Sequence, residues 1–588
     1  MAFETIPQRV LDHAQRLGSA PAYHVRGASG WEATSWQTYA GEVRRAGSAL
    51  MALGVETTQP VCILGANRPE WVIFDVGSMA AGAVPAGIYA TSSPGECAYI
   101  LNHSEAPVLL VENESQWQKI ASVRDQLPHL RHVVMMRGGA VDDPMVIGWD
   151  DFLARGDGGP NLEERLAGLR PDTVSTLIYT SGTTGQPKGV MLTQDNLAWT
   201  AAHACDMVDA SQKERVLSYL PLSHIAEQMF TIHIAAVVGY PVYYAESLDK
   251  LLSNLLEVKP TMFFGVPRVW EKFHAGVVEK LGEAHGAKAK LAERAMAIGR
   301  HVTTRRAKGL GASFTDVAQY KAFDKLVYSK VKDGLGLGEA RVCVSGAAPI
   351  ASEVLEFFAG FGLPIYEVYG QSEDTGPTTF NVPGKTKFGT VGPPFPGVEV
   401  KIASDSEIIV RGRNVFAGYF KDPQSTAETM ADGWLHSGDL GEFDADGFLT
   451  ITGRKKDIII TAGGKNVAPT LLEGGLKTHP LVAEVVVIGD RRRFLAALVS
   501  LDSEAVERFM KERELSGPAD QSEEIRAEIQ QAIDEVNAEM ARVEQIKKFT
   551  ILPREFSIAE GELTPTLKVK RNVVTSNFES EIEAMYAD

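Results

Sequence analysis

Short apolar runs that alternate with helix-compatible stretches constrain the fold of this chain more than any other feature. Between about residues 60 and 397, runs rich in Val, Ile and Tyr recur between segments that favour helices. This alternation is typical of βα units that build a mostly parallel sheet. Residues 173–180, 341–345 and 363–369 each read as a strand that runs directly into a Gly-rich or polar turn. Because ligands of such folds bind where strands end, these turns are the first places to expect a functional site.

The pattern changes after residue 397, which predicts a second kind of domain. Residues 398–403, 407–410 and 448–452 look like short strands, the last preceded by an Asp446-Gly447 turn. Beyond residue 454, strands are expected at 457–461, 484–488 and 495–501, followed by an amphipathic helix that opens at Ser522. The apolar stripe of that helix would consist of Ile525, Ile529, Ile533, Val536, Met540 and Val543. A chain of 588 residues is long enough for a large domain and a small one.

Charge and composition exclude several classes of function. The formal net charge of −17 argues against nucleic acid as a partner, because a binding face needs enough Lys and Arg to displace phosphate counterions. The 4 cysteines form no CxxC pair, so we expect buried thiols rather than disulfides or a zinc site. No apolar run approaches the ~20 residues of a membrane helix, and the N-terminal residues MAFETIPQRV lack the apolar core of a signal peptide. Cytoplasmic residence is therefore expected, with peripheral membrane contact left open.

The strongest motif is YTSGTTGQPKG at residues 179–189. Glycines let backbone N–H groups approach phosphate oxygens, hydroxyls add donors and the lysine adds charge. The spacing differs from that of a Walker A loop. The candidate phosphate contacts are Thr180, Ser181, Gly182, Thr183, Thr184, Gly185 and Lys188.

This segment resembles the phosphate loop of the adenylate-forming superfamily, which includes acyl-CoA synthetases, luciferases and peptide-synthetase adenylation domains. Further family-like motifs follow in the expected order along essentially the whole chain. They are SGAAP at 345–349, VYGQSE at 368–373, WLHSGD at 434–439, TGRKKD at 452–457, GGKN at 463–466 and LTPTLK at 563–568.

The resemblance implies roles for these motifs in binding ATP and Mg²⁺. The loop of Gly346, Ala347 and Ala348 would bind adenine, together with Tyr369, Gly370, Gln371 and Ser372 of the central motif. Asp439 would accept hydrogen bonds from the ribose hydroxyls, and Arg454 would be a second ribose or phosphate contact. Glu373 and the hydroxyl of Thr184 would hold Mg²⁺, which bridges ATP oxygens.

The catalytic residues that the resemblance implies are spread over both domains. Lys568 would bridge the attacking carboxylate and the α-phosphate, although a basic patch of Lys568, Lys570 and Arg571 would be the simpler interpretation of that segment alone. His224, in the LPLSHI segment at 220–225, would line the carboxylate site. The small domain would rotate about Lys456 between the half-reactions and present the loop at Gly464 to the pantetheine channel of coenzyme A.

The implied fold is α/β, with a large N-terminal domain of mostly parallel βα layers plus a small β-barrel-like part, followed by a small mobile α+β domain. The expected boundaries are 1–453 for the AMP-binding domain, 454–457 for the hinge and 458–588 for the C-terminal domain. Two glycines, Gly474 and Gly475, follow the PTLLE segment at 469–473 and should weaken that helix by about 1 kcal/mol each relative to Ala.

The substrate expected from the resemblance is a long-chain fatty acid. The FGVPRVWEK segment at 264–272, the TSSP run at 91–94 and a helical insertion at 271–334 are similar to long-chain acyl-CoA synthetases, and YGQSEDTGP is closest to the bubblegum-type branch. The insertion leans basic, which fits either a solvated arm or contact with an anionic membrane or the fatty substrate's entrance. The expected reaction joins the acid to coenzyme A and releases AMP and diphosphate.

Three alternatives share some of these features. A fatty acyl-AMP ligase would keep the nucleotide motifs and deliver the acyl group to an acyl carrier protein, but its insertion near the hinge is not apparent between Asp439 and Lys456. A non-catalytic acyl-nucleotide-binding protein would be expected to have lost Lys188, Glu373 or Lys568, and all three are present. A luciferase-like oxygenase would need a luciferin site, of which the sequence shows no sign.

Overall fold

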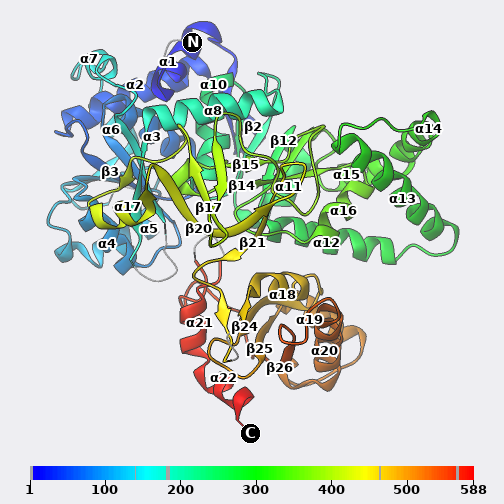
Figure 1. Cartoon of the computed structure of the whole chain (residues 1–588). Coiled ribbons are helices and arrows are strands. Elements are labelled where there is room, and N and C mark those ends of the chain that lie inside the picture. The colour runs from blue at the N-terminus through cyan, green and yellow to red at the C-terminus, as the bar shows by residue number, and fades with distance from the viewer. Residues whose placement is uncertain (1–3, 139–140, 181–185, 463–464, 565–567, 588) are drawn as a thin grey trace.

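The computed structural model describes residues 4–138, 141–180, 186–462, 465–564 and 568–587. A large domain carries about the first three-quarters of the chain, and a small domain at the C-terminal end lies against one side of it (Figure 1). None of the helices in these ranges combines the length and apolarity that crossing a bilayer requires. The expected α/β architecture with two domains of unequal size is confirmed.

The first of two 8-stranded sheets has the order β18-β9-β8-β4-β3-β5-β6-β7. Its strands are β18 (Gly418–Tyr419), β9 (Lys188–Thr193), β8 (Val174–Thr180), β4 (Val84–Ile88), β3 (Pro60–Leu64), β5 (Val108–Val111), β6 (His132–Met135) and β7 (Val146–Gly148). Neighbours from β8 to β7 are parallel, whereas β8 and β9 form an antiparallel pair whose connecting turn carries the YTSGTTGQPKG motif. The strand predicted at 173–180 is thus β8.

The second 8-stranded sheet has the order β15-β14-β13-β12-β10-β11-β1-β2. Its strands are β15 (Thr379–Phe380), β14 (Ile365–Tyr369), β13 (Val342–Ser345), β12 (Met262–Gly265), β10 (Val216–Ser218), β11 (Val242–Tyr244), β1 (Pro21–Gly27) and β2 (Gly30–Ser35). The interior pairs are parallel and only the two edge pairs are antiparallel. The strands predicted at 341–345 and 363–369 are β13 and β14, side by side, so their C-terminal turns lie together.

Helices fill the space between these sheets and cover their outer faces. In the large domain they are α1 (Ile6–Arg16), α2 (Trp36–Ala52), α3 (Pro69–Ala80), α4 (Pro94–Ser104), α5 (Glu114–Ala121), α6 (Trp149–Ala154), α7 (Leu162–Ala167), α8 (Gln194–Val208), α9 (Ile225–Gln228), α10 (Ile234–Val238), α11 (Leu251–Val258), α16 (Ser352–Gly360) and α17 (Pro423–Thr429). Side chains from one face of each sheet share a single core with α2, α3, α8 and α10. Alternate residues face other cores: Ile63 of β3 points inward, and Cys62 and Leu64 pack under α4 and α5.

The helical insertion forms an arm that projects from the large domain (Figure 1). It consists of α12 (Pro267–Gly282), α13 (Ala287–Ala307), α14 (Phe314–Phe323), a π-helical turn at Asp324–Tyr328 and α15 (Ser329–Gly334). No strand interrupts the described residues of this arm, which confirms the helical prediction for 271–334. Trp270 of α12 is fully buried and donates hydrogen bonds to the carbonyls of Gly265 (3.1 Å) and Val344 (3.2 Å), so it packs the base of the arm.

The β-barrel-like part of the large domain is a 5-stranded sheet of antiparallel pairs. It comprises β16 (Glu399–Ile402), β17 (Glu407–Arg411), β19 (Met430–Ala431), β20 (Trp434–Phe443) and β21 (Leu449–Arg454). The predicted turn between the last two strands is present, with Gly447 at a φ of 81° and the Asp444 N–H donating to the Phe448 carbonyl. The long strand β20 carries the WLHSGD motif to the edge that faces the small domain.

The small domain contains a 3-stranded sheet of order β24-β25-β26 with helices packed on it, and a separate 2-stranded sheet of β22 and β23. Its elements are β22 (Ile459–Ile460), β23 (Asn466–Val467), α18 (Pro469–Leu476), β24 (Val482–Ile488), β25 (Leu495–Leu501), α19 (Ser503–Glu512), α20 (Glu523–Ala538), β26 (Ile546–Ile551), α21 (Arg571–Asn577) and α22 (Glu579–Tyr586). Ser522 caps α20 as predicted, and Ile525, Ile529 and Ile533 are buried.

Two sequence predictions for this domain are wrong in detail. Val543 does not continue the apolar stripe of α20, because the helix ends at Ala538 and the Val543 side chain is 56% exposed. The strand predicted at 457–461 is reduced to β22, since a turn at residues 455–457 precedes it. Both errors lie near the ends of helices or strands, where the chain changes direction. The periodicity of apolar residues does not predict such changes.

Contrary to the sequence prediction, the two glycines of α18 should not affect stability equally, because their surroundings differ. A Cβ at Gly475 would lie 2.9 Å from Cγ2 of Val536 on α20, whereas nothing lies within 4 Å of a Cβ at Gly474. We expect Gly474→Ala to stabilise the domain by about 0.5–1 kcal/mol through helix propensity and Gly475→Ala to destabilise it by about 1 kcal/mol or more through overpacking. Denaturant unfolding of the two variants would measure this, and changes of the same sign would contradict the packing explanation.

Candidate functional site

The lysine of the YTSGTTGQPKG motif is held at the start of β9. In the β8–β9 register Lys188 pairs with Thr180, and residues 181–185, which include the predicted contacts Ser181, Gly182, Thr183, Thr184 and Gly185, lie outside the described residues. The Lys188 amine donates to the Ser425 hydroxyl (2.6 Å) and lies 4.9 Å from the ring centroid of Tyr419. The side chain is exposed, so its amine is available to an anion on the solvent side of the loop.

The turns after β13 and β14 come close together because of their glycines. A Cβ at Gly346 would lie 2.7 Å from Cγ1 of Val368, and one at Gly370 would lie 1.5 Å from the Gly376 carbonyl oxygen. Ala347 has a φ of 70°, a left-handed conformation that is unusual for a residue with a Cβ, and Ala348 is exposed. The predicted adenine loop is therefore a tight backbone turn beside the central motif.

Asp439 joins three of the predicted residues in one hydrogen-bond network. Its Oδ2 accepts hydrogen bonds from the Tyr369 hydroxyl (2.9 Å) and from Nε2 of Gln371 (2.7 Å), and its Oδ1 accepts one from Nε of Arg454 (2.8 Å). Asp439 is 4% exposed, and the Arg454 guanidinium supplies its counter-charge. A buried carboxylate with this support is held in one orientation.

Glu373 is linked to the other predicted residues through Tyr419. The Tyr419 hydroxyl donates to Oε1 of Glu373 (2.8 Å), and the same ring carries the Lys188 amine on its face. Burial raises the pKa of Glu373, while the hydrogen bond from Tyr419 opposes that shift. Next to it, Ser372 is buried and Asp374 accepts a hydrogen bond from the Gln371 N–H (2.6 Å), which fixes the turn.

His224 caps the short helix α9, and this contact settles its tautomer. Its Nδ1 accepts a hydrogen bond from the Ala226 N–H (3.2 Å), so the neutral ring carries its proton on Nε2. Burial and the nearby charge of Lys568 lower the pKa of His224 to about 4, which keeps the ring neutral at physiological pH.

A buried network positions the loop that carries His224. Glu227 accepts hydrogen bonds from the Ser218 hydroxyl (2.7 Å), the Thr231 hydroxyl (2.6 Å) and the Leu220 N–H (3.2 Å). Asn67, in the bend that follows β3, donates a hydrogen bond to the Leu220 carbonyl (2.6 Å) and accepts one from the Leu222 N–H (3.1 Å). Burial raises the pKa of Glu227 to about 7. Residues at or just after strand ends of both 8-stranded sheets, Ser218 and Asn67, therefore help to hold the loop that carries His224.

Lys568 reaches this site from the far end of the chain. Its backbone forms a narrow turn with Thr564, the Lys568 N–H donating to the Thr564 hydroxyl (3.0 Å) and the Thr564 N–H to the Lys568 carbonyl (2.7 Å). The side chain stays accessible to solvent at the junction of the two domains. Partial loss of water and the charge of Arg454 lower the pKa of Lys568 to about 8, whereas the carboxylates of Asp439 and Glu373 oppose the shift.

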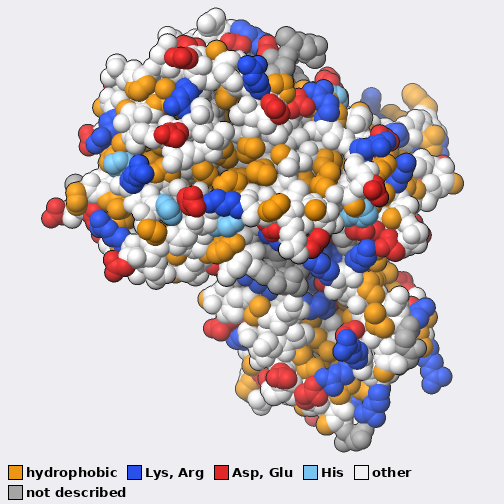
Figure 2. All heavy atoms as spheres, turned by 60° about the vertical axis from the view of Figure 1, so that its left-hand side comes forward, with side chains coloured by type: hydrophobic (Ala, Val, Ile, Leu, Met, Phe, Trp, Pro, Cys, Tyr) orange, Lys and Arg blue, Asp and Glu red, His pale blue; other side chains and the backbone are white. Residues whose placement is uncertain are grey.

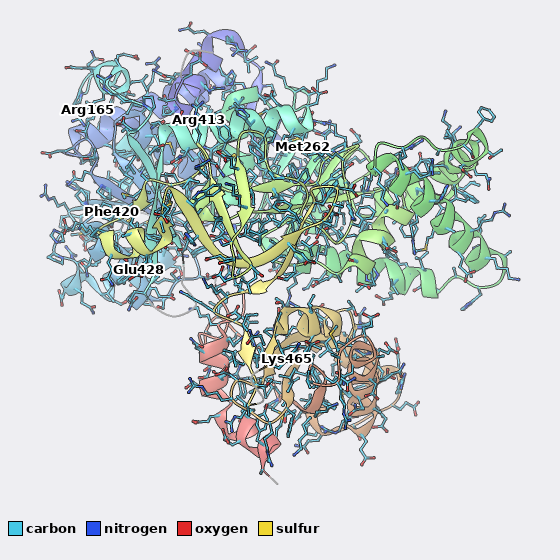
Figure 3. The ribbon with its side chains drawn as sticks, viewed as in Figure 1. Arg165, Met262, Arg413, Phe420, Glu428 and Lys465 are labelled. Atoms are coloured by element: carbon cyan, nitrogen blue, oxygen red, sulfur yellow. The ribbon has the colours of Figure 1, made fainter. Side chains whose placement is uncertain are left out.

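The predicted hinge coincides with an anchored strand end. Lys455 pairs with Asp405 (2.7 Å) and Glu407 (3.1 Å) of the large domain, and its N–H donates to the Gly438 carbonyl (2.9 Å). Lys456, the next residue, is exposed in the turn that leads to β22. Gly464 lies outside the described residues. The neighbouring Lys465 pairs with Glu544 (3.7 Å), and Figure 3 shows it in the small domain.

The structure therefore brings Lys188, Tyr369, Glu373, Asp439, Arg454, His224 and Lys568 to one region, where strand ends of the large domain meet the small domain. Lys and Arg side chains gather on both sides of the waist between the domains (Figure 2). Among the described residues, no group of three or more His, Cys, Asp and Glu could hold a metal ion without help from a ligand.

Sequence reasoning missed Tyr419 and Asn67. Tyr419 lies in the GYFKD segment at 418–422, and only the pairing of β18 with β9 brings it beside Lys188. Asn67 follows β3, and a polar residue after a buried strand was the one signal that pointed to it. The turn after β3 meets the His224 loop only because the two sheets pack against a common helical layer.

Comparisons with known proteins agree with this arrangement. The model of the AMP-binding enzyme family matches residues 10–420, and the model of the AMP-binding enzyme C-terminal domain matches residues 456–588. The chain is 37% identical to the long-chain-fatty-acid–CoA ligase ACSBG2 of Xenopus laevis, covering 99% of this chain and 84% of that protein. It is 40% identical to the long-chain-fatty-acid–CoA ligase FadD15 of Mycobacterium bovis, covering 95% of this chain and 92% of that one.

Solved structures share the fold at lower identity. The anthranilate CoA ligase AuaEII in complex with anthranoyl-AMP superposes with a TM-score of 0.75 at 22% identity, covering 99% of both chains. The o-succinylbenzoate CoA synthetase of Bacillus subtilis with its acyl-adenylate superposes with a TM-score of 0.69 at 21% identity, covering 96% of this chain and 97% of that one.

Proposed function

The chain belongs to the AMP-binding enzyme family, and from that premise we propose that it is a long-chain fatty acid–CoA ligase. It would use ATP to convert a fatty acid into an acyl-adenylate and then transfer the acyl group to coenzyme A. The observation that carries the proposal is the approach of Lys568, from the end of the small domain, to Asp439, Glu373 and Arg454 of the large domain. An ammonium group beside a nucleotide site fits a reaction that builds negative charge on phosphate.

In the first half-reaction, a carboxylate oxygen of the fatty acid forms a bond to the α-phosphorus of ATP while the bond to the β-phosphate breaks and pyrophosphate leaves. The Asp439 carboxylate would accept hydrogen bonds from the ribose hydroxyls. The turn at Gly346, Ala347 and Ala348 would bind adenine against Tyr369. The Lys568 ammonium would lie between the attacking carboxylate and the α-phosphate and offset the charge that develops there. Lys188 and the adjoining loop would hold the departing pyrophosphate.

His224 would donate a hydrogen bond rather than take up a proton. Its Nδ1 is occupied by the Ala226 N–H, and its pKa of about 4 leaves only the Nε2–H as a donor. A neutral N–H donor suits a carboxylate oxygen whose charge is shared with Lys568. Asn67 and Glu227 would keep this donor in place through the backbone of 220–222.

The residues present fit a Mg²⁺ ion, for which Glu373 supplies the one carboxylate ligand. Mg²⁺ is commonly held by one or two carboxylates together with substrate phosphates and water. The Tyr419 hydroxyl occupies Oε1 of Glu373, which leaves Oε2 as the ligand oxygen. When bound there with ATP, the ion would neutralise charge on the phosphates; Thr184 would be its second contact.

The second half-reaction requires the small domain to turn. The thiol sulfur of coenzyme A bonds to the acyl carbonyl carbon, the bond from that carbon to the phosphate oxygen of AMP breaks so that AMP leaves, and the thiol proton passes to solvent. We place the domains at 1–453 and 458–588 with the hinge at 454–457, because Lys455 is anchored to the large domain and Lys456 is not. Rotation about Lys456 would withdraw Lys568 and present the Gly464 loop to the pantetheine arm.

Product release with a panel of acids tests the proposal. AMP and pyrophosphate should appear from ATP and Mg²⁺ with C12 to C18 fatty acids, and sustained turnover should require coenzyme A. Benzoate is the control for an aryl substrate. Pyrophosphate release that coenzyme A does not accelerate would indicate an acyl-AMP ligase that delivers to an acyl carrier protein, and no turnover with any acid would refute the proposal.

The pH dependence of the first half-reaction should report Lys568. Because its pKa of about 8 lies below the ordinary value, the free enzyme loses the required ammonium as the pH rises through 8. We expect kcat/KM for ATP in pyrophosphate exchange to fall above pH 8 with a slope approaching −1, since this ratio reports ionisations of the free enzyme. In Lys568→Arg the guanidinium stays charged, so the same limb should be absent; a limb retained in this variant would assign it to another group.

We further propose cytoplasmic residence with peripheral contact between the helical arm and an anionic membrane. Residues 271–334 hold thirteen Lys and Arg against seven Asp and Glu in a chain of net charge −17. The arm also exposes large apolar side chains, among them Phe314 at 89% and Leu310 at 51%. Basic residues around exposed apolar ones favour the surface of a bilayer with anionic lipids.

Co-sedimentation with vesicles tests the membrane contact. We expect binding to phosphatidylcholine vesicles that contain about a third phosphatidylglycerol, weakened by salt, because each basic residue near the surface contributes about 1 kcal/mol. Phe314→Ser with Leu310→Ser should reduce it severalfold. The matched control is Leu248→Ser with Leu252→Ser, which are exposed leucines outside the arm. Equal loss in both double variants, or no binding at all, would refute the arm as the contact surface.

A further inference from the structure

The first turn of α12 lies directly against the small domain, next to α18 and α19 (Figure 1). Arg268, the second residue of this helix, points its guanidinium across the domain boundary. Glu271, one turn later, faces the same group of charges: burial raises its pKa, and Glu484 adds to that shift while Lys477 and Arg268 oppose it. The base of the arm is thus an ionic contact between the two domains.

Arg268 bridges two carboxylates that the small domain itself holds in place. Its Nη1 lies 3.7 Å from Oε1 of Glu484, and its Nη2 lies 3.7 Å from Oε2 of Glu555. The other oxygen of Glu484 pairs with Lys477 (2.9 Å), and the other oxygen of Glu555 accepts the Ser503 N–H (2.8 Å). Each carboxylate therefore has one oxygen fixed within its own domain and one turned toward Arg268.

This cluster is better shielded than the second ionic contact between the domains. The side chains of Arg268 and Glu484 are 28% and 8% exposed, whereas those of Arg508 and Glu279, which pair at 2.7 Å across the same boundary, are 54% and 57% exposed. Exposed single pairs contribute little to stability, but half-buried charges in a network are less screened by water and salt. The Arg268 cluster should therefore contribute most of the ionic attraction across this boundary.

An interaction that exists in one domain orientation shifts the equilibrium toward that orientation. The Arg268 cluster spans the two domains while Lys568 is at the nucleotide site, and a rotation about the hinge would separate its members. Resting on the proposed function, we propose that Arg268 is a positioning residue for acyl-adenylate formation: it holds Glu484 and Glu555 so that the small domain keeps Lys568 at the reacting phosphate. Arg268 would act through the orientation of the small domain, by its contacts with Glu484 and Glu555, and not by binding a substrate.

We call the contact of Arg268 with Glu484 and Glu555 the clamp. Half-reaction kinetics with a charge reversal at Arg268 test it. In Arg268→Glu a new carboxylate faces those of Glu484 and Glu555, so we expect pyrophosphate exchange to fall about tenfold, the shift that about 1.4 kcal/mol of differential stability produces. Conversion of supplied acyl-AMP by coenzyme A should change less than twofold. The double variant Arg268→Glu with Glu555→Arg should recover most of the exchange rate, because it restores one attractive pair.

A control variant separates the clamp from a general charge effect. Arg300 pairs with Glu356 (3.2 Å) within the large domain, so Arg300→Glu should leave both half-reactions within twofold of the unmodified protein. Equal losses in both halves for Arg268→Glu, an equal loss in Arg300→Glu, or no recovery in the double variant would each overturn the proposal.

A distance measurement tests the clamp without any turnover. All four cysteines, Cys62, Cys97, Cys205 and Cys343, are buried, so spin labels can be directed to Glu353→Cys on the large domain and Glu512→Cys on the small one, both exposed positions. Pulsed electron resonance should give one main distance with ATP and Mg²⁺, and a second population in Arg268→Glu. If fatty acids are not turned over but this shift occurs, the proposed function fails and the clamp stands; identical distributions would overturn the clamp alone.

Discussion

Replacing Lys568 with alanine is expected to lower acyl-adenylate formation by about 10²–10³-fold while leaving the second half-reaction largely intact. Loss of one preorganised charge contact to a transition state has an effect of this size. In the orientation that the structure shows, the Lys568 amine is within electrostatic reach of Asp439, Glu373, Arg454 and His224. Pyrophosphate exchange measures the first half-reaction, and consumption of supplied acyl-AMP with coenzyme A measures the second.

Lys570→Ala is the matched control for this experiment. Lys568 and Lys570 belong to the same basic segment, but only Lys568 is placed at the site. If the segment were simply a charged surface patch, the two substitutions would have equal effects. An equal loss of both half-reactions in Lys568→Ala would refute the division of labour between domain orientations, and unchanged pyrophosphate exchange would remove Lys568 from the chemistry. Because the side chain is solvent-accessible, neither substitution should unfold the protein.

Local patterns predicted the strands that carry the site, and the reason is their composition. β8, β13 and β14 are short apolar runs bounded by Gly-rich or polar turns, so periodicity and turn chemistry agree about where each strand ends. Residues Tyr369 and Gly370 could be placed at a strand end for the same reason. The fold class followed because parallel strands that alternate with helices have few arrangements.

Contacts between residues far apart in the sequence could not be predicted from local patterns. Tyr419 reaches Glu373 through the pairing of β18 with β9, and residues 373 and 419 share no spacing rule. Arg268 reaches Glu484 and Glu555 only through the relative position of two domains, which no local pattern encodes. The tautomer of His224 likewise depends on one backbone N–H at the start of α9.

The glycines of α18 show how propensity alone can mislead. Both residues lower helix propensity equally, and the sequence therefore predicted equal destabilisation at 474 and 475. The structure distinguishes them, since Val536 of α20 packs where a Cβ of Gly475 would be and Gly474 faces open space. Packing between helices thus decides which of two identical residues the fold requires.

The second large effect is expected at Asp439, because its carboxylate serves two purposes. It is the predicted ribose acceptor, and its charge opposes the fall in the pKa of Lys568 that burial and, to a lesser extent, Arg454 cause. Asp439→Ala should lower kcat/KM for ATP by about 10²–10³-fold, since Tyr369, Gln371 and Arg454 lose their common acceptor as well. Initial rates of pyrophosphate exchange at varied ATP would measure the loss.

Asp439→Asn separates the two purposes. The amide keeps one acceptor oxygen but removes the charge, so we expect a smaller loss at pH 7 together with a shift of the alkaline limb of the pH profile to below pH 8. Asp444→Asn is the control, because Asp444 is partly exposed and pairs with Lys387 within the large domain. If the Asp439→Asn profile keeps its limb at pH 8, Asp439 does not maintain the charge of Lys568 and its role is confined to the ribose. A limb that moves in Asp439→Asn and stays in place in Asp444→Asn would tie the nucleotide motif of the large domain to the protonation of the lysine that the small domain supplies.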